Sequence, residues 1–370
     1  MTNDGWENSS AKRPIPATPA ITWLLHHGAA VATPGNLLYE LCERLVLEGL
    51  QITGARLSIA SLNPMVSQAR IRWHRESGRV LEEVLLHGMA IETTPADIRS
   101  VRRAFPATGN EIEWHAIGSD GFSAEERTYL DAVSVVMAAP LQVVIERGVT
   151  RGLLQAYLGR RSADKVLGGA VRRGSGEMIE AVVWISDLRD FTRLSETLPY
   201  DQIITALNDC CARLVGAIQP FGGEVLKFIG DGLVAIFPLE PQGENAACDA
   251  AIAAVRAARE GMARLDAERL RSGLPPLPFG VGLHLGTVVY GNIGSPDRLD
   301  FTAIGPAVNV ASRIEGMCRP LACPVLVSED VATRCTMQLA ALGLHSLRGT
   351  AQPVALFTLP ELITAMRTNH

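Results

Sequence analysis

The sequence lacks the cysteine patterns and the charge excess that mark several specialised classes of protein. Its seven cysteines form no Cys-x-x-Cys pair, and their number is odd. In a chain of 370 residues that is 47% hydrophobic, this usage predicts reduced thiols rather than a disulfide framework. The net charge is −5 at pH 7, whereas nucleic-acid-binding proteins usually carry a basic surface. We therefore expect no nucleic-acid partner.

The sequence also lacks an apolar segment at its N-terminus. Residues 1–14 are polar and contain no hydrophobic region of the kind found in signal peptides. The most apolar later stretch, residues 132–145, is shorter than a membrane-spanning helix and contains Pro140. These features predict a cytoplasmic protein with no membrane partner.

Changes in composition divide the chain into five segments. Residues 1–20 are polar and rich in proline, which predicts a disordered lead-in. Residues 146–177 mix short helical stretches with glycine and arginine. We interpret them as a connector with a solvated surface, and a contact with an acidic partner is the alternative. The remaining segments are an N-terminal module at 21–145, a compact unit of helices and strands at 178–361, and a tail at 362–370.

The N-terminal module has the pattern of a small α+β domain. Apolar residues recur at helical spacing over 37–47. Two alternating runs, 56–62 and 69–74, flank the turn signal at 63–64 and predict paired strands. A capping box opens a second apolar helix over 123–144. The module loosely resembles GAF-type sensors, which implies an unknown small-molecule or protein regulator.

The unit at 178–361 alternates strands and helices. An apolar run at 181–186 predicts a buried strand, and glycines at 222–223 and around Asp231 predict turns. The predicted strands are 181–186, 224–229, 233–237, 279–285, 287–291, 325–327 and 354–358, and the predicted helices are 200–218, 246–265 and 307–317.

Two aspartates stand at strand ends in this pattern. Asp187 directly follows the first apolar strand, and Asp231 lies at a glycine-flanked hairpin tip. Two converging carboxylates suit Mg²⁺, which binds a few carboxylates together with phosphate oxygens. A pair that bridges two ions would suit phosphoryl transfer. Carboxylates are also common in turns, so spacing alone leaves a structural role open.

Three longer segments carry a resemblance to a known family. They read ISDLRDFT at 185–192, GEVLKFIGDG at 223–232 and FTAIGPAVNVASR at 301–313. Together, in this order and at this spacing, they resemble the class III adenylate/guanylate cyclase catalytic domain over about residues 178–361. The resemblance implies an α+β protein with a ferredoxin-like (βαββαβ) catalytic domain behind the sensor-like module. It also implies an adenylate cyclase that converts ATP to 3′,5′-cyclic AMP and pyrophosphate.

The resemblance further implies a metal site and a phosphate site. Asp187, Asp231 and the backbone carbonyl of Leu188 would bind two Mg²⁺ ions, for which Mn²⁺ can substitute. One ion would lower the pKa of the ribose 3′-hydroxyl and the other would neutralise the triphosphate. The 3′-oxygen then attacks the α-phosphorus in line, a reaction that depends on positioning and charge stabilisation. Backbone N–H groups around Phe191 and Thr192, at a helix start, would bind phosphates.

Three polar residues near the C-terminus are candidates for catalysis. Asn309 and Arg313 lie four apart, so a helix places them on one face, and their mostly apolar neighbours argue against a plain surface pair. The resemblance implies that Asn309 orients the ribose and that Arg313 stabilises charge at the α-phosphate. Arg348 matches a position that contacts the triphosphate, and a surface arginine is the alternative there.

The choice of purine depends on two positions. Lys227 and Thr302 match the residues that read adenine in the family, because a lysine can donate to N1 and a side-chain oxygen can accept from the 6-amino group. Guanylate cyclases typically carry Glu and Cys there.

Two positions depart from the pattern of the family. Asp190 replaces a common glycine, which we expect to raise the KM for the nucleotide, and Pro306 replaces a common Asp or Asn, where we expect little effect.

In this family the active site forms between two catalytic domains. The chain contains both sets of residues, so the resemblance implies a homodimer with two composite sites. Asp187 and Asp231 would come from one protomer, and the partner would supply Lys227, Thr302, Asn309, Arg313 and Arg348. One alternative is a guanylate cyclase, which Lys227 disfavours. The other is a catalytically weak nucleotide-binding regulatory dimer, which the presence of both sets of residues disfavours.

Overall fold

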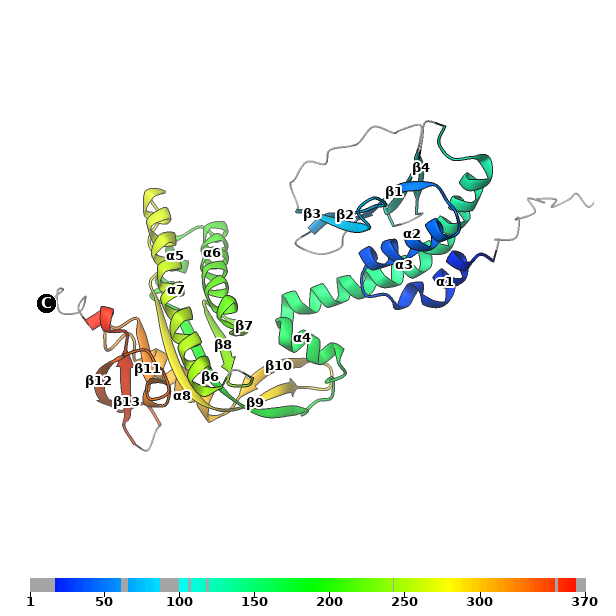
Figure 1. Cartoon of the computed structure of the whole chain (residues 1–370). Coiled ribbons are helices and arrows are strands. Elements are labelled where there is room, and N and C mark those ends of the chain that lie inside the picture. The colour runs from blue at the N-terminus through cyan, green and yellow to red at the C-terminus, as the bar shows by residue number, and fades with distance from the viewer. Residues whose placement is uncertain are drawn as a thin grey trace, which may run out of the picture. The chain divides into compact units, whose positions relative to one another are not determined.

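The structure is a computed structural model with two compact units, which divide between Leu153 and Leu154 (Figure 1). The division lies within the predicted connector, 146–177. The predicted turn at 63–64 lies outside the described residues, as do most of the lead-in and of the tail. The residues described are 17–60, 66–86, 100–105, 108–117, 120–241, 243–349 and 352–363.

The N-terminal unit contains a five-stranded antiparallel sheet in the order β3-β2-β1-β5-β4. The predicted strand pair is confirmed, since β1 and β2 pair with Leu57 opposite Ile71. The strands β3, β4 and β5 were not predicted, and α1 (Pro19–His27) begins inside the predicted lead-in. The other elements are η1 (Gly28–Ala30), α2 (Pro34–Leu47), β1 (Ile52–Ala60), β2 (Val66–His74), β3 (Arg79–Leu86), β4 (Ser100–Ala104) and β5 (Glu111–Ala116).

The helix α3 (Ala124–Leu158) is longer than the predicted helix at 123–144. Its capping box is confirmed, because the Glu126 N–H donates to Ser123 Oγ (3.1 Å) and the Ser123 N–H donates to the Glu126 carboxylate (2.8 Å). With 35 residues it is long and apolar enough to cross a membrane, so the expectation that this stretch is too short was wrong. Core helices of globular domains meet the same criterion, and α3 buries Val133 and Met137 in the core of its unit.

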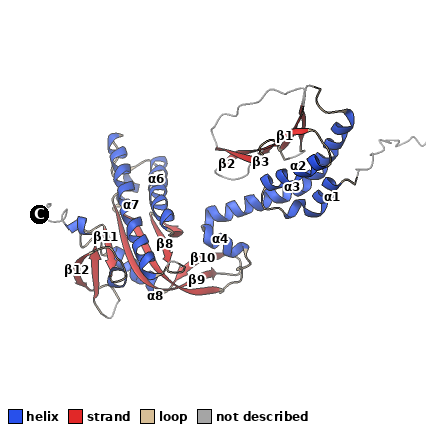
Figure 2. Cartoon of the chain, viewed as in Figure 1, coloured by secondary structure: helices blue, strands red, loops and turns tan. Residues whose placement is uncertain are grey.

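The C-terminal unit is built on one large sheet, whose strands are red in Figure 2. The strand order is β12-β13-β11-β9-β6-β8-β7, with β10 paired to β9. Its predicted helices and hairpin are confirmed, but the two strands predicted at 279–285 and 287–291 form a single strand, β9 (Phe279–Gly294). The other strands are β6 (Gly176–Leu188), β7 (Glu224–Ile229), β8 (Gly232–Pro238), β10 (Leu299–Ile304), β11 (Val325–Ser328), β12 (Ala340–His345) and β13 (Val354–Thr358).

The strands β6, β7, β8 and β9 follow one another along the chain, with α6 (Tyr200–Ile218) between the first two and α7 (Glu244–Arg271) between the last two. Every neighbouring pair in the order β9-β6-β8-β7 is antiparallel. The mixed α+β class that the sequence predicted is therefore confirmed for this unit.

The sheet separates two cores, because successive side chains of a strand point to opposite faces. On β6, Val182 and Trp184 pack under α6 and α7, which lie side by side in Figure 1. Ala181 and Val183 belong to the core on the other face, to which α4 (Arg160–Leu167) and α8 (Pro306–Gly316) contribute. The ends of β6 and of the β7–β8 hairpin are thereby fixed, and both carry candidate site residues.

Candidate active site

The two strand-end aspartates lie together in the structure. Asp187 is the penultimate residue of β6, and Asp231 is in the turn between β7 and β8. The pairing of Ser186 with Leu233 brings this turn beside the end of β6. A Cβ atom on Gly232 would lie 2.5 Å from the Ser186 carbonyl oxygen and 2.9 Å from Asp187 Oδ1. A side chain at position 232 would therefore push the two strand ends apart.

The electrostatics of the pair suit a cation. Burial raises the pKa of Asp187, and the charge of Asp231 and a hydrogen bond with it raise this pKa further, while Arg189 opposes the shift. Among the described residues, no group of three or more His, Cys, Asp or Glu side chains is placed to hold a metal. Two carboxylates are nevertheless what Mg²⁺ uses when phosphate oxygens and water complete its coordination. The donor set present therefore fits Mg²⁺ or Mn²⁺.

The segment after β6 carries the predicted phosphate-binding residues. Asp190 has φ = +55°, which explains why a glycine would suit this position: the backbone is left-handed. Asp190 Oδ1 lies 2.7 Å from Arg319 Nη2, so this carboxylate forms an ion pair. Phe191 begins the short helix α5 (Phe191–Thr197) and packs against the core, whereas Thr192 is exposed. Phe191 and Thr192 thus follow Asp187 by four and five residues.

The helix α8 presents the predicted catalytic pair. Asn309 is exposed and Arg313 is half-buried. Arg313 donates from Nη1 to the carbonyl oxygen of Gly349 (3.2 Å), so the structure brings it beside the segment that contains the exposed Arg348. Pro306 is the first residue of α8, where a missing backbone N–H costs nothing, which accounts for proline at this position.

The two predicted purine-reading residues lie on β7 and β10, which contact each other but are not paired in the sheet. Lys227 is on β7, and its Nζ atom is 3.3 Å from Asp300 Oδ2 on β10. Thr302, two residues further along β10, is buried, and its Oγ1 atom has no hydrogen-bond partner in the described structure. Asp300 and Thr302 share one side of the strand. Asp300 was missed by the sequence analysis, although its alternation with Thr302 was the signal that could have indicated it.

The candidate site residues lie at three places in the chain. Asp187, Leu188 and Asp231, the candidate metal ligands and here called the metal group, lie at the end of β6 and in the β7–β8 turn. Lys227 and Thr302 lie on β7 and β10, and Asn309 and Arg313 lie on α8 beside the segment that contains Arg348; these residues are here called the nucleotide group. Within the described part of the chain, no hydrogen bond or ion pair joins a residue of the metal group to one of the nucleotide group.

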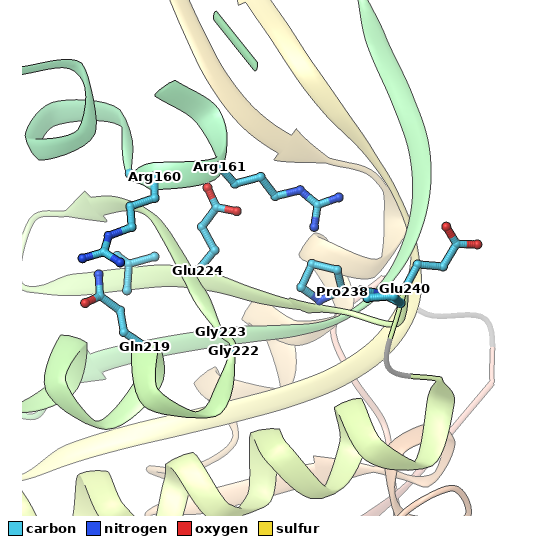
Figure 3. Close-up of a pocket in the computed structure, with 11 residues that line it drawn as sticks. Arg160, Arg161, Gln219, Gly222, Gly223, Glu224, Pro238 and Glu240 are labelled. Atoms are coloured by element: carbon cyan, nitrogen blue, oxygen red, sulfur yellow. The ribbon is translucent and has the colours of Figure 1, made fainter. Parts of the chain in front are cut away.

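The connector contributes an anchoring contact that the sequence analysis did not find. Glu224 Oε1, on β7, accepts hydrogen bonds from the Ser162 backbone N–H (3.1 Å), the Ser162 hydroxyl (3.3 Å) and the Tyr290 hydroxyl (3.0 Å). Figure 3 shows the Glu224 side chain reaching α4 between Arg160 and Arg161, at the edge of a cavity of about 330 Å³. The buried Ser162 shows that α4 docks on the sheet, so this part of the connector is not a solvated surface.

Comparison with known proteins shows what the C-terminal unit is similar to. Residues 176–359 match the family described as the adenylate and guanylate cyclase catalytic domain. The adenylate cyclase of Anabaena cylindrica is 35% identical over 162 residues, which are 43% of this chain and 31% of that protein. Adenylate cyclase 1 of Rhizobium meliloti is 27% identical over 346 residues, or 93% of this chain and 47% of that protein.

The fold has counterparts among solved structures. A bacterial light-regulated adenylyl cyclase matches 69% of this chain and 83% of its own with a TM-score of 0.51 at 22% identity, which is a likeness of fold alone. The chain spans less than half the length of either curated relative. The match over residues 176–359, which make up most of the C-terminal unit, is to the adenylate and guanylate cyclase catalytic domain that the three sequence segments predicted.

Proposed function

We propose that the protein is a nucleotidyl cyclase, and specifically an adenylate cyclase that converts ATP to 3′,5′-cyclic AMP and pyrophosphate in a homodimer. The observation that carries this proposal is the contact between Asp187 and Asp231 at the strand ends of a class III cyclase domain. The antiparallel core of β6, α6, β7, β8, α7 and β9 supports the ferredoxin-like assignment.

The residues of the metal group would hold and orient the triphosphate. Asp187 and Asp231, with the Leu188 carbonyl, would hold two Mg²⁺ or Mn²⁺ ions. When bound, these ions would supply charge neutralisation and a lower pKa for the 3′-hydroxyl. The backbone N–H groups of Phe191 and Thr192 would bind phosphate oxygens, in the manner of a helix start.

The residues on α8 would act on the ribose and the α-phosphate. Asn309 would orient the sugar, and Arg313 would donate to the oxygens on which negative charge accumulates. Arg348 would contact the triphosphate, and the bond from Arg313 to Gly349 keeps the two arginines in one region. Following the resemblance to the cyclase family, whose active sites form between two catalytic domains, we assign the metal group and the nucleotide group to opposite protomers of a dimer.

The preference for ATP is supported by the chemistry around Lys227. Its ammonium group donates only, so it suits N1 of adenine and not the protonated N1 of guanine. Asp300, two residues before Thr302 on β10, contacts this ammonium group, and the buried Thr302 Oγ1 has no hydrogen-bond partner in the described structure, so it could accept from the 6-amino group. A guanylate cyclase would need a hydrogen-bond acceptor at position 227, where this chain has a lysine. GTP is therefore the less favoured of the two candidate substrates.

The test is an assay of the full chain with ATP and with GTP, each with Mg²⁺ and with Mn²⁺. We expect cyclic AMP as the main product and expect Asp187→Ala to abolish it. Glu260→Ala, which removes an exposed carboxylate on α7, is the control and should keep full activity. Full activity of the Asp187→Ala variant would refute the metal assignment. Cyclic GMP as the main product would show that the substrate is GTP rather than ATP.

A further inference from the structure

A half-buried ion pair connects the metal-binding end of β6 to α8. Arg189 Nη2 lies 2.7 Å from Glu315 Oε1, and the two side chains are 21% and 11% exposed. The same nitrogen also donates to the backbone carbonyl of Glu315 at 3.4 Å. Arg189 follows Asp187 by two residues, and Glu315 follows Arg313 by two. The pair therefore joins the two segments that carry the metal ligands and the catalytic arginine.

The strand β9 leaves room for this pair. A Cβ atom on Gly280 would lie 1.7 Å from Arg189 Nη2 and 2.8 Å from Glu315 Oε1. A Cβ atom on Gly282 would lie 2.5 Å from the Glu315 backbone nitrogen. Two glycines on the same side of β9 thus let α8 and the Arg189 side chain approach the sheet closely. The ion pair therefore fills the space that the missing side chains of Gly280 and Gly282 leave beside β9.

Two further contacts hold the same segment. The Arg189 backbone N–H donates to the Pro278 carbonyl (2.6 Å), just before β9. Asp190 pairs with Arg319 beyond the end of α8, but this pair is exposed and adds little free energy. The half-buried contact of Arg189 with Glu315 is therefore the one that can fix the orientation of the segment.

The charges around Glu315 explain why the pair is needed. Glu315 is buried near the Asp187 and Asp231 carboxylates, and burial together with both of them raises its pKa, while Arg189 opposes this shift. Arg189 is the cation that lies among these three acids. Replacing a buried ion pair by apolar side chains is often neutral for stability, so the pair need not stabilise the fold.

We propose that Arg189 and Glu315 are positioning residues for the cyclase reaction. Their ion pair fixes the metal-binding segment against α8 and so sets the distance between Asp187 and Arg313 within each protomer. This inference rests on the proposed dimer, in which those two residues serve different composite sites. The pair then also couples the two sites, because a shift at one metal segment moves the helix that serves the other site.

The test replaces both members at once, Arg189→Met with Glu315→Met, in the full-length protein. We expect the thermal midpoint and the dimer to be retained, because no charge is left buried alone. Turnover should fall by about 100-fold, the size of effect that a misplacement of about 1 Å produces, with a smaller change in the KM for ATP. Titration with Mn²⁺ in the presence of a non-cyclisable ATP analogue should show weaker binding of the metal.

Two further variants make the result specific. Arg189→Lys keeps the charge beside Glu315 and should recover part of the lost turnover. Arg213→Met with Glu268→Met removes a 3.1 Å ion pair between α6 and α7 and should leave turnover and Mn²⁺ binding unchanged. Unchanged turnover and Mn²⁺ affinity in the Arg189→Met, Glu315→Met protein would overturn the inference. If the unmodified protein makes no cyclic nucleotide, the proposed function fails, while the Mn²⁺ titration still tests the pair.

Discussion

Asp187 and Asp231 form a contact that costs free energy until a cation binds. Two carboxylates in contact repel each other, which is why the pKa of Asp187 is raised by Asp231 in addition to its burial. A divalent cation favours the ionised form of both groups, so it would turn repulsion into attraction. The contact therefore supports the proposed metal binding, because two ionised carboxylates in contact lower the stability of the protein unless a cation lies between them.

Gly232 makes this contact possible, and its replacement is the most local test of the site. Gly232→Ala would place a methyl group 2.5 Å from the Ser186 carbonyl, so the turn must move away from β6. We expect a loss of about 1–3 kcal/mol in the free energy of unfolding, as in other overpacked sites. Metal-dependent turnover should also fall, because the movement of the turn separates Asp231 from Asp187. Turnover, Mn²⁺ binding and thermal unfolding are the measurements.

Gly216 provides the matched control. A Cβ atom there would meet no other atom within 4 Å, and the residue lies inside α6. Gly216→Ala should therefore stabilise the protein by up to about 1 kcal/mol, because alanine favours the helix, and should leave turnover unchanged. Normal Mn²⁺ binding and turnover in Gly232→Ala would show that the close approach of the turn is not required.

The purine preference can be tested by changing the residues around Lys227. Lys227→Glu with Thr302→Cys should move the preference from ATP towards GTP, because a carboxylate can accept from N1–H of guanine. Glu at position 227 would face Asp300, so the variant should also carry Asp300→Asn to remove the repulsion. The measurement is the ratio of kcat/KM for the two nucleotides. An ATP preference equal to that of the unmodified protein would refute the assignment of Lys227 and Thr302.

At the scale of single residues, the sequence predicted the convergence of Asp187 and Asp231, because each follows an apolar strand, and the structure brings the two carboxylates together. The roles of these and of the other candidate residues stay predictions. Asp300 and the Arg189–Glu315 pair were not predicted, because their contacts join residues 73 and 126 positions apart. Local spacing does not reveal which of 39 acidic residues faces a given cation.

At the scale of elements, periodicity predicted what is amphipathic or wholly apolar. It predicted α6 and the β7–β8 hairpin almost to the residue. It divided β9 in two at Gly286, a position that is glycine because a Cβ there would lie 2.9 Å from the Cβ of Ala307. It missed β12, which is largely exposed and contains a register shift before Gly343. Such edge strands are defined by their pairing partner rather than by their own pattern.

The docking of α4 on β7 predicts a dependence of stability on pH. Burial raises the pKa of Glu224, and the hydrogen bonds from Tyr290 and Ser162 oppose the shift only in part. Folding therefore favours the protonated acid. This contribution to stability is complete below the pKa of the unfolded state and is lost as the pH rises through the raised pKa of the folded state.

Glu224→Gln should remove this dependence, because an amide resembles the protonated acid and can still accept from Tyr290 and Ser162. We expect the thermal midpoint of the unmodified protein to fall relative to that of the variant as the pH rises from mildly acidic to neutral. The measurement is thermal unfolding of both full-length proteins across this range at constant ionic strength. Glu260→Gln, on the exposed side of α7, is the control and should follow the unmodified protein. A constant difference between Glu224→Gln and the unmodified protein at every pH would contradict the prediction.

At the scale of the whole molecule, the candidate site residues lie on different elements. Asp187 lies at the end of β6, whereas Asn309 lies on the exposed side of α8. In the proposed homodimer, the substrate would bind between two copies of the chain, each of which would supply one half of each site. Two-fold symmetry gives two identical sites per dimer.

This arrangement predicts that two inactive variants restore each other. Asp231→Ala lacks a metal ligand and Arg313→Ala lacks the catalytic arginine, so neither homodimer has an intact site. In a heterodimer, one of the two sites receives Asp231 from one protomer and Arg313 from the other. Random pairing of equal amounts should therefore recover about a quarter of the activity of the unmodified dimer, since half of the dimers carry one working site. Mixing Asp187→Ala with Asp231→Ala is the control: both changes affect the same half-site, so no site is restored. If the first mixture stays inactive while heterodimers are captured through two different tags, the shared-site arrangement is wrong.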